Sequence, residues 1–201
     1  MSRIMVIGAR GRAGSAAAAE AVRRGHEVTL VARSGPVAGD VTDAGRIAEL
    51  AAGHDAVIAG VYDGGADPTV FFPEAAAALV NGLTKSSVSR LVWVGLASIL
   101  PTADGRLLMD TDGYPNEYRS FYLAHQAALD AFKASDLDWV SVAPAGDFNH
   151  ASPARLGGYR VAPADAGELV SYADLAIALV DEVDRPAHHR EAIGVVARQV
   201  V

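Results

Sequence analysis

The sequence contains no cysteine among its 201 residues, which excludes disulfides, thiolate metal ligands and a cysteine nucleophile. Basic residues are also in deficit, because 17 Lys and Arg stand against 24 Asp and Glu, for a formal net charge of −7. Such a surface repels polyanions, so we expect neither nucleic acid nor an anionic membrane as a partner. A local basic cluster can still bind a small anion.

Long hydrophobic runs are missing as well. The longest apolar segment, residues 91–100, is interrupted by Gly95 and Ser98 and is too short to cross a bilayer. The apolar stretch that ends at Gly8 is too brief for a secretory signal. We therefore expect a cytoplasmic protein, and its 51% of hydrophobic residues are enough for the core of one domain.

Short apolar runs alternate with helical stretches along most of the chain. Strands are predicted at 3–7, 26–33, 36–41, 55–61, 90–95, 137–144 and 192–198, and helices at 12–25, 43–52, 69–85, 119–135 and 172–183. This alternation predicts the α/β class, as a Rossmann-type doubly wound parallel sheet of about seven strands with helices on both faces.

Two segments interrupt that alternation. Residues 96–118 and 145–171 are rich in Gly, Pro and Asp and are longer than a connection requires. We expect a single domain over 1–201 in which these two segments form a small substrate-side portion.

Three glycines follow the first predicted strand and open the first predicted helix. Gly8 allows a tight turn, Gly11 lets the backbone approach a pyrophosphate, and Gly14 lets the helix pack closely on the sheet. The alternative is a strand-to-helix turn that merely needs glycine. The position directly before a helix N-terminus favours phosphate binding by a dinucleotide.

The second predicted strand ends in a basic residue rather than an acidic one. Arg33 and Ser34 stand where NAD enzymes place a carboxylate for the ribose 2′-hydroxyl, and Arg10 and Arg12 lie within the glycine loop. Guanidinium groups match a 2′-phosphate, so three arginines converging on one spot predict NADP(H) rather than NAD(H). The alternative for Arg33 is a solvated charge at a strand end.

Several segments, taken in order, resemble one known family. They are "IGARGRAG", "ARS", "GDVTD", "DAVIAGV", "RLVWVGLASIL", "NEYRSFYLAHQAALDAFKASDLDWVSVAPAGDF" and "SYADLAIALVDEVDRP". They are similar to the atypical short-chain dehydrogenase/reductase group, in particular its NmrA-like, NAD(P)H-binding proteins described as NADH-flavin reductases and the related biliverdin/flavin reductases. The resemblance covers nearly the whole chain.

The resemblance implies roles for residues at the ends of the strands. An adenine pocket is implied at Asp40 and Val41, and a ribose border at Gly60 and Val61. Backbone facing the nicotinamide is implied at Gly95, Leu96, Ala97 and Ser98, and at Pro144 and Ala145. The alternatives are a local turn at Asp40 and an eased strand exit at Gly60.

The wider superfamily uses a Ser and a Tyr-x-x-x-Lys pair, and this chain does not keep the pair. Neither Tyr118 nor Tyr122 is followed by Lys four positions later. The resemblance places Ser98 at the active-site serine and His125 where the family often has Lys or His. Tyr118, Tyr122 and His125 share one helical face and are predicted to converge, with His125 able to supply a proton near neutral pH.

These candidate catalytic residues also have ordinary structural interpretations. Ser98 is equally consistent with a turn that ends a strand. Tyr122 and His125 are equally consistent with a pair packed against the sheet.

Loss of the usual acid favours hydride transfer to a flat conjugated acceptor, such as a flavin or a quinone-like molecule, because solvent can protonate the reduced ring. Tyr114, Pro115, Phe148, His150 and Tyr159 are candidates for the walls around such an acceptor. One alternative is a redox sensor or scaffold that binds NADP(H) without turnover. Another is a reductase of a secondary-metabolite ketone, with His125 or a tyrosine as the acid.

No metal is predicted. His188 and His189 lack a third ligand at metal spacing. Asp104, Asp110 and Asp112 share one loop but miss the pattern of a calcium loop.

Overall fold

A mostly parallel sheet forms the centre of the computed structural model, which describes residues 1–152 and 154–198. Its strand order is β2-β1-β3-β4-β5-β9-β7. In that order the strands are Glu27–Val31, Arg3–Ile7, Ala56–Ala59, Arg90–Val94, Asp138–Pro144, Glu191–Ala197 and Tyr159–Ala162. Neighbours are parallel except for the edge strand β7, which is antiparallel to β9.

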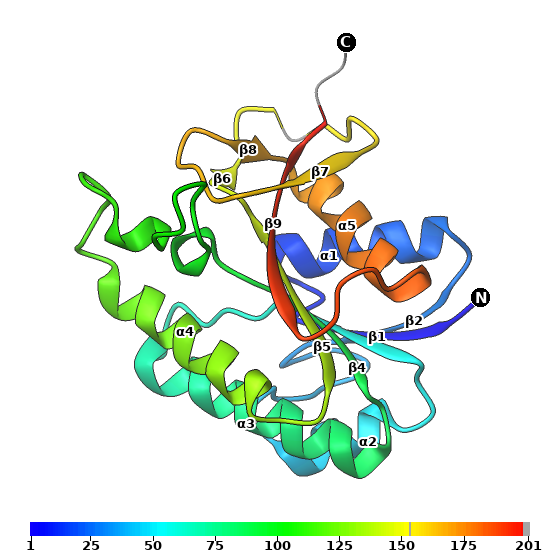
Figure 1. The fold of residues 1–201 in the computed structure, drawn as a ribbon. Coiled ribbons are helices and arrows are strands. Elements are labelled where there is room, and N and C mark those ends of the chain that lie inside the picture. The colour runs from blue at the N-terminus through cyan, green and yellow to red at the C-terminus, as the bar shows by residue number, and fades with distance from the viewer. Residues whose placement is uncertain (153, 199–201) are drawn as a thin grey trace.

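Helices cover both faces of this sheet (Figure 1). One face carries α1 (Arg12–Arg23) and α5 (Tyr172–Asp184), and the other carries α2 (Ala44–Ala51), α3 (Pro68–Ser86) and α4 (Arg119–Lys133). Two short 3-10 turns, η1 (Ala97–Ile99) and η2 (Leu108–Asp110), precede α4, and β6 (Asp147–Phe148) pairs with β8 (Leu169–Val170) in a separate ribbon. The predicted Rossmann-type α/β class is confirmed.

Burial on both faces explains why the strands read as continuous apolar runs. Successive side chains of a strand point to opposite faces, so Met5 and Ile7 pack with α2, α3 and α4, whereas Ile4 and Val6 pack with α1 and α5. Trp93 is 2% exposed and packs on the α3–α4 side.

Side-chain caps fix where three of the helices begin. Asp43, Asp67 and Ser171 precede α2, α3 and α5, and each accepts a hydrogen bond from a backbone N–H in the first turn of its helix. The caps therefore hold the loops that precede these helices at the carboxyl ends of the strands.

The strand predicted at 36–41 is wrong. This segment contributes only a single bridge, between Ala32 and Ala38. Gly35 adopts a positive φ of 125° and Pro36 has no N–H to donate, so the chain turns there instead of pairing. The seventh strand is β7, which comes from the 145–171 segment, so part of that segment belongs to the main sheet.

Strand order places a crevice at one edge of the sheet. The chain passes from β1 to β2 on one side and later returns to β3 on the other side of β1. Ligands of doubly wound folds bind at the carboxyl ends of the strands where the order reverses in this way.

Within 1–152 and 154–198, no helix combines the length and apolar character needed to cross a bilayer.

Candidate functional site

A cavity of about 1100 Å³ lies at the carboxyl ends of β1, β2, β3 and β4. The predicted cofactor residues on its wall are Gly8, Arg10, Gly11, Arg12, Ala13, Arg33, Ser34, Asp40, Val41, Gly60, Val61, Gly95 and Leu96. Most of its other lining residues come from the β3–α3 loop, from α3 and α4, and from Phe148 and Tyr172. One cavity thus reaches from the end of β2 to Phe148 of β6 and Tyr172 of α5.

The glycines of the first turn have different tasks. A Cβ on Gly8 would lie 2.1 Å from the Gly60 carbonyl oxygen, and one on Gly14 would lie 2.2 Å from the Gly8 carbonyl oxygen. Gly8 also adopts a positive φ of 78°. Glycine at 8 and 14 is therefore required by the close approach of β1, α1 and β3.

Gly11 differs from the other two. It lies on the cavity wall as the N-cap of α1, with φ −73° and ψ 162°, a conformation open to any residue. A Cβ there would lie 3.2 Å from the nearest atom, the Gly8 carbonyl oxygen. Gly11 is thus the glycine of the motif whose backbone is exposed to the cavity rather than packed against β3.

The N-terminus of α1 opens onto this cavity. Glycine at the N-cap offers no capping side chain, and the first-turn residues 12–15 include no carboxylate. The first N–H groups of a helix have no intrahelical partner and carry a partial positive charge, which suits a pyrophosphate. The residues present therefore fit a dinucleotide at this end of the cavity.

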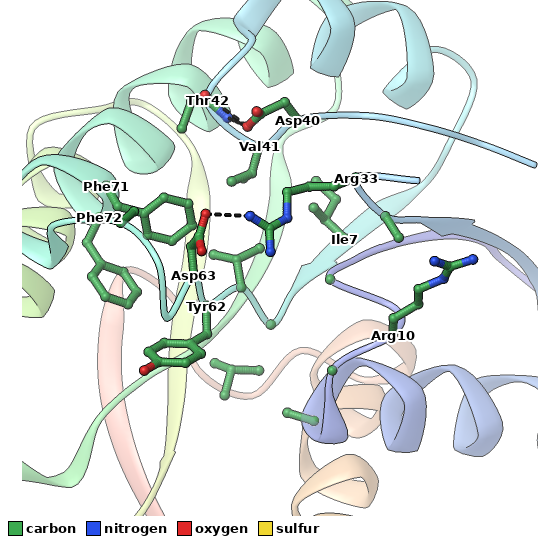
Figure 2. Close-up of a pocket in the computed structure, with 18 of the residues that line it drawn as sticks. Ile7, Arg10, Arg33, Asp40, Val41, Thr42, Tyr62, Asp63, Phe71 and Phe72 are labelled. Atoms are coloured by element: carbon green, nitrogen blue, oxygen red, sulfur yellow. Dashed lines mark hydrogen bonds and ion pairs between the residues drawn. The ribbon is translucent and has the colours of Figure 1, made fainter. Parts of the chain in front are cut away.

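The three arginines do not converge on one spot, which corrects the prediction. Arg33 forms an ion pair with Asp63, and Arg10 donates a hydrogen bond to Ser34 Oγ at 2.8 Å. Figure 2 shows the Arg33 guanidinium turned toward Asp63 and the Arg10 guanidinium pointing elsewhere. Arg12 lies at the start of α1 and faces the β6–β8 side, 3.4 Å from His150 Nδ1 and 6.0 Å from the centre of the Tyr172 ring.

Asp40 holds a local turn at the cavity wall. Its Oδ1 accepts hydrogen bonds from the backbone N–H and the hydroxyl of Thr42, both at 2.9 Å (Figure 2). This turn presents Val41, which is 6% exposed, as an apolar floor. These contacts agree with the alternative interpretation of Asp40 as a residue of a local turn.

The residues expected around the nicotinamide divide into two groups. Gly95 and Leu96 line the cavity, and a Cβ on Gly95 would lie 2.2 Å from Ser141 Oγ, so glycine is needed for packing there. Ala97, Pro144 and Ala145 are buried and lie outside the described lining of the cavity.

The candidate catalytic residues face different surroundings. Ser98 is 2% exposed and its Oγ lies 2.9 Å from Tyr114 Oη, and the Tyr122 ring lies 5.6 Å from that of Tyr114. Burial raises the pKa of Tyr122. Tyr118 is 59% exposed. Among the described residues, the cavity lining includes neither Ser98 nor these tyrosines.

His125 is set apart from that hydroxyl cluster. It is 6% exposed, and its ring centre lies 3.9 Å from that of Phe72 and 4.8 Å from that of Phe121. Burial lowers the pKa of His125 to about 3. His125 is therefore neutral at physiological pH and cannot serve as the imidazolium acid that the sequence suggested. The predicted convergence of Tyr118, Tyr122 and His125 is not what the structure shows.

Aromatic side chains form much of the wall, and sequence reasoning missed most of them. Phe148, a predicted wall residue, stacks on Tyr172 with ring centres 3.8 Å apart and an interplanar angle of 12°. The capping pattern of Ser171 and Asp174 could have placed Tyr172 at the first position of α5. The other missed aromatic residues are Tyr62, Phe71, Phe72 and Phe121.

The histidine pair and the acidic loop are engaged in local contacts. His188 Nδ1 lies 2.7 Å from Glu182 and His189 Nδ1 lies 2.8 Å from Asp138. Asp104 accepts hydrogen bonds from Thr102 and Arg106. Within the described part of the chain, no cluster of acidic and histidine residues could hold a metal ion.

This fold and this cavity define a Rossmann-type nucleotide-binding domain. Residues 8–186 match the model of a family described as NAD(P)H-binding, and the chain belongs to that family. Its relatives agree with the atypical short-chain dehydrogenase/reductase resemblance. A nicotinamide cofactor is thus supported, and the family supports an NAD(P)H-dependent oxidoreductase.

Three similar proteins come from bacteria. The uncharacterized protein YwnB of Bacillus subtilis is 31% identical over 97% of this chain and 98% of its own. A "putative exported protein" from Burkholderia pseudomallei is 33% identical with a TM-score of 0.83, over 98% of this chain and 100% of its own. A "putative NADH-flavin reductase" from Streptococcus pneumoniae TIGR4 is 29% identical with a TM-score of 0.85, over the same shares.

Proposed function

We propose that the protein is an NADPH-dependent reductase that transfers hydride from the nicotinamide to a flat conjugated acceptor, such as a flavin or a quinone-like molecule. The observation that carries the proposal is the single elongated cavity. It begins at Arg33 beside the end of β2, passes the N-terminus of α1, and ends against the stacked rings of Phe148 and Tyr172.

Each part of this cavity has a role in the proposal. The backbone at Gly11 and the first N–H groups of α1 bind the pyrophosphate, and Arg33 and Ser34 bind the ribose that carries the 2′-phosphate. Gly95 and Leu96 border the nicotinamide end. The bound cofactor supplies a hydride, and the residues around it fix its orientation relative to the acceptor and exclude water.

A flat acceptor agrees with the chemistry of the wall. Aromatic and apolar side chains suit a planar ligand. The neutral His125 and the enclosed hydroxyl of Ser98 do not offer a charged acid to the cavity. A conjugated ring that takes its proton from solvent needs no such acid. The relative named "putative NADH-flavin reductase" supports a flavin as the acceptor, although its name refers to NADH.

Calorimetric titration of the purified protein with NADPH and NADH tests the cofactor. We expect Arg33→Ala to weaken NADPH binding by about 1.5–3 kcal/mol, the contribution of a charged hydrogen bond, and to leave NADH binding nearly unchanged. An equal loss for both cofactors would contradict the role of Arg33 at the 2′-phosphate.

A redox sensor that binds NADP(H) without turnover is the second candidate. It is favoured by the position of Ser98, whose Oγ lies 2.9 Å from Tyr114 Oη and which is not part of the cavity lining. Steady-state reduction of riboflavin by NADPH separates the two candidates. Leu96→Trp places a bulky residue at the nicotinamide end of the cavity. If the rate saturates with riboflavin in the wild type, and this saturation is lost in a Leu96→Trp variant that still binds NADPH, the reductase is supported. A rate that rises linearly with riboflavin and ignores this substitution supports the sensor.

A further inference from the structure

The ion pair between Arg33 and Asp63 occupies the place that the proposed function gives to a phosphate. Arg33 follows β2, and Asp63 belongs to the β3–α3 loop on the other side of the topological switch point. Both side chains line the cavity and point toward each other (Figure 2). A carboxylate of the protein therefore holds the cation on which NADPH selectivity depends.

The two partners are not equally free to move. Asp63 Oδ1 accepts a hydrogen bond from the backbone N–H of Gly65 at 3.0 Å, so its own loop fixes this carboxylate. Its side chain is 22% exposed, whereas the Arg33 side chain is 66% exposed. When a ligand enters, Arg33 is the partner that can turn away, and Asp63 stays at the cavity wall.

We propose that Asp63 is a specificity-determining residue that lowers the affinity of this site for a 2′-phosphorylated dinucleotide. It does so in two ways, because the phosphate must displace it from Arg33 and must then sit near an uncompensated negative charge. A dinucleotide with a free 2′-hydroxyl meets neither cost, since Arg33 can remain paired. This inference rests on the proposed function, specifically on the binding of NADPH through Arg33.

The substitution Asp63→Asn tests the inference with little change in shape. The asparagine Oδ1 still accepts the hydrogen bond from Gly65, so the loop keeps its turn, while the charge is lost. Glu74→Gln is the matched control, because Glu74 also lines the cavity and loses one negative charge without touching Arg33. NADPH and NADH affinities are measured by calorimetry for the wild type, both single variants, Arg33→Ala and the Asp63→Asn/Arg33→Ala double variant.

We expect Asp63→Asn to raise NADPH affinity roughly three- to tenfold and to leave NADH affinity within about twofold. A gain of this size is expected when the phosphate no longer has to break the exposed Arg33–Asp63 pair and is no longer repelled by the Asp63 carboxylate. Compared with Arg33→Ala alone, the double variant should keep only the part of the gain that comes from the lost repulsion, and Glu74→Gln should show no gain. An unchanged NADPH affinity overturns the inference. A loss of NADH affinity also overturns it, because Asp63 would then hold the ribose hydroxyl. If the wild type binds neither cofactor, the proposed function itself fails.

Discussion

At the scale of single residues, the glycine motif contains two separable requirements. Gly8 and Gly14 have no room for a Cβ against neighbouring backbone, whereas Gly11 has ordinary dihedral angles and faces the cavity. We expect Gly11→Val to abolish binding of NADPH and NADH while the protein still folds. Calorimetry reads the binding and circular dichroism reads the fold. Retained affinity in folded Gly11→Val would contradict a pyrophosphate at this position.

A second prediction for a single residue concerns His125 and the pH dependence of stability. Its pKa of about 3 lies below the ordinary value of 6.5, so the unfolded chain binds the proton more readily than the native protein. The stability that His125 gives is therefore full above about pH 6.5 and is lost as the pH falls toward 3.

His125→Leu removes this linkage and keeps an apolar contact with Phe72 and Phe121. When the pH falls from 7 to 5, the wild type should lose about 2 kcal/mol more free energy of unfolding than the variant. This figure corresponds to about 1.5 pH units below 6.5, at 1.36 kcal/mol each. Urea unfolding at the two pH values measures it. Parallel losses in both proteins would show that His125 is protonated in the native state.

Spacing predicted which residues gather at the site better than it predicted where long side chains point. Gly8 and Arg33 line the cavity, as expected from the ends of parallel strands, and Asp40, which the resemblance implied, lines it as well. The direction of Arg12 depends on Tyr172 and His150, which are more than a hundred residues away in the sequence. A pattern read along the chain contains no information on such distant partners.

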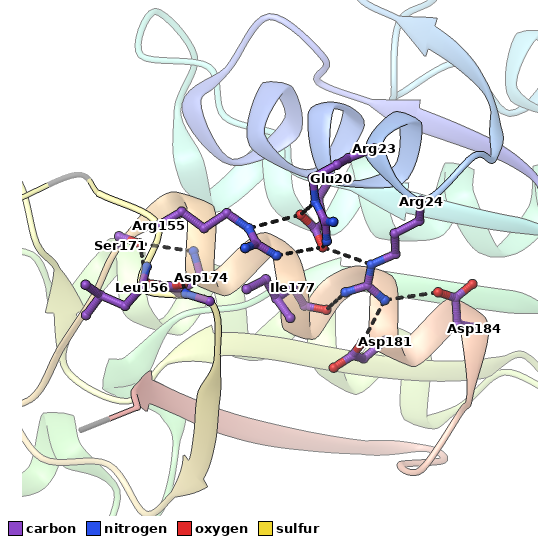
Figure 3. Close-up of polar contacts among 11 residues, drawn as sticks. Glu20, Arg23, Arg24, Arg155, Leu156, Ser171, Asp174, Ile177, Asp181 and Asp184 are labelled. Carbon is purple, nitrogen blue, oxygen red and sulfur yellow. Dashed lines mark hydrogen bonds and ion pairs between the residues drawn. The ribbon is translucent and has the colours of Figure 1, made fainter. Parts of the chain in front are cut away.

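At the scale of elements, a charged cluster joins α1, α5 and the segment that follows Phe148 (Figure 3). Glu20, 4% exposed, accepts hydrogen bonds from Arg23, Arg24 and Arg155, and Arg24 also binds Asp181 and Asp184. Asp174 accepts hydrogen bonds from the backbone N–H groups of Leu156 and Gly157. The cluster therefore holds residues 155–157 against two helices.

Glu20→Gln should lower the free energy of unfolding by about 2–3 kcal/mol at pH 7, less than for a fully buried pair because Arg23 and Arg155 are partly exposed. Burial alone would raise the pKa of Glu20, but the three arginines lower it from 4.5 to about 2. The stabilisation is thus present above about pH 4.5 and lost toward pH 2.

Denaturant unfolding from pH 7 to pH 3 checks this, with the variant losing less stability on acidification than the wild type. Glu49→Gln, which removes a carboxylate from an exposed pair with Arg46, is the control and should change little. Equal effects of the two substitutions would show that burial of Glu20 adds nothing.

Element types followed the hydrophobic pattern closely because the central strands β1, β3, β4 and β5 are buried on both faces. The helices begin and end within about two residues of their predicted bounds, owing to caps such as Asp43 and Ser171 that the sequence displays. The strand predicted at 36–41 is wrong because this apolar, glycine-containing stretch pairs with its neighbour only through the bridge between Ala32 and Ala38. The residues that pair between β7 and β9 lie 32 to 38 positions apart in the sequence, and local pattern does not specify such pairing.

At the scale of the whole molecule, ligand binding should stabilise the fold, because the cavity that binds the ligand exists only in the folded chain. NADPH at about 100 times its dissociation constant adds about 2.7 kcal/mol to the free energy of unfolding. For a chain of this size that raises the melting temperature by about 5–10 °C. Scanning calorimetry with NADPH measures the shift, and Gly11→Val should show none. A shift of equal size in that variant would place the ligand elsewhere.

The backbone contact among Gly8, Gly14 and Gly60 has a consequence for how descendants of this protein would change. A lineage that lost its cofactor would still be held to glycine at 8 and 14, because those two positions protect the junction of β1, α1 and β3. Position 11 would tolerate other residues better, because a Cβ there would lie 3.2 Å from the Gly8 carbonyl oxygen rather than about 2 Å from backbone. The residue found at position 11 would then distinguish a chain that still binds a dinucleotide from one that has kept only the scaffold.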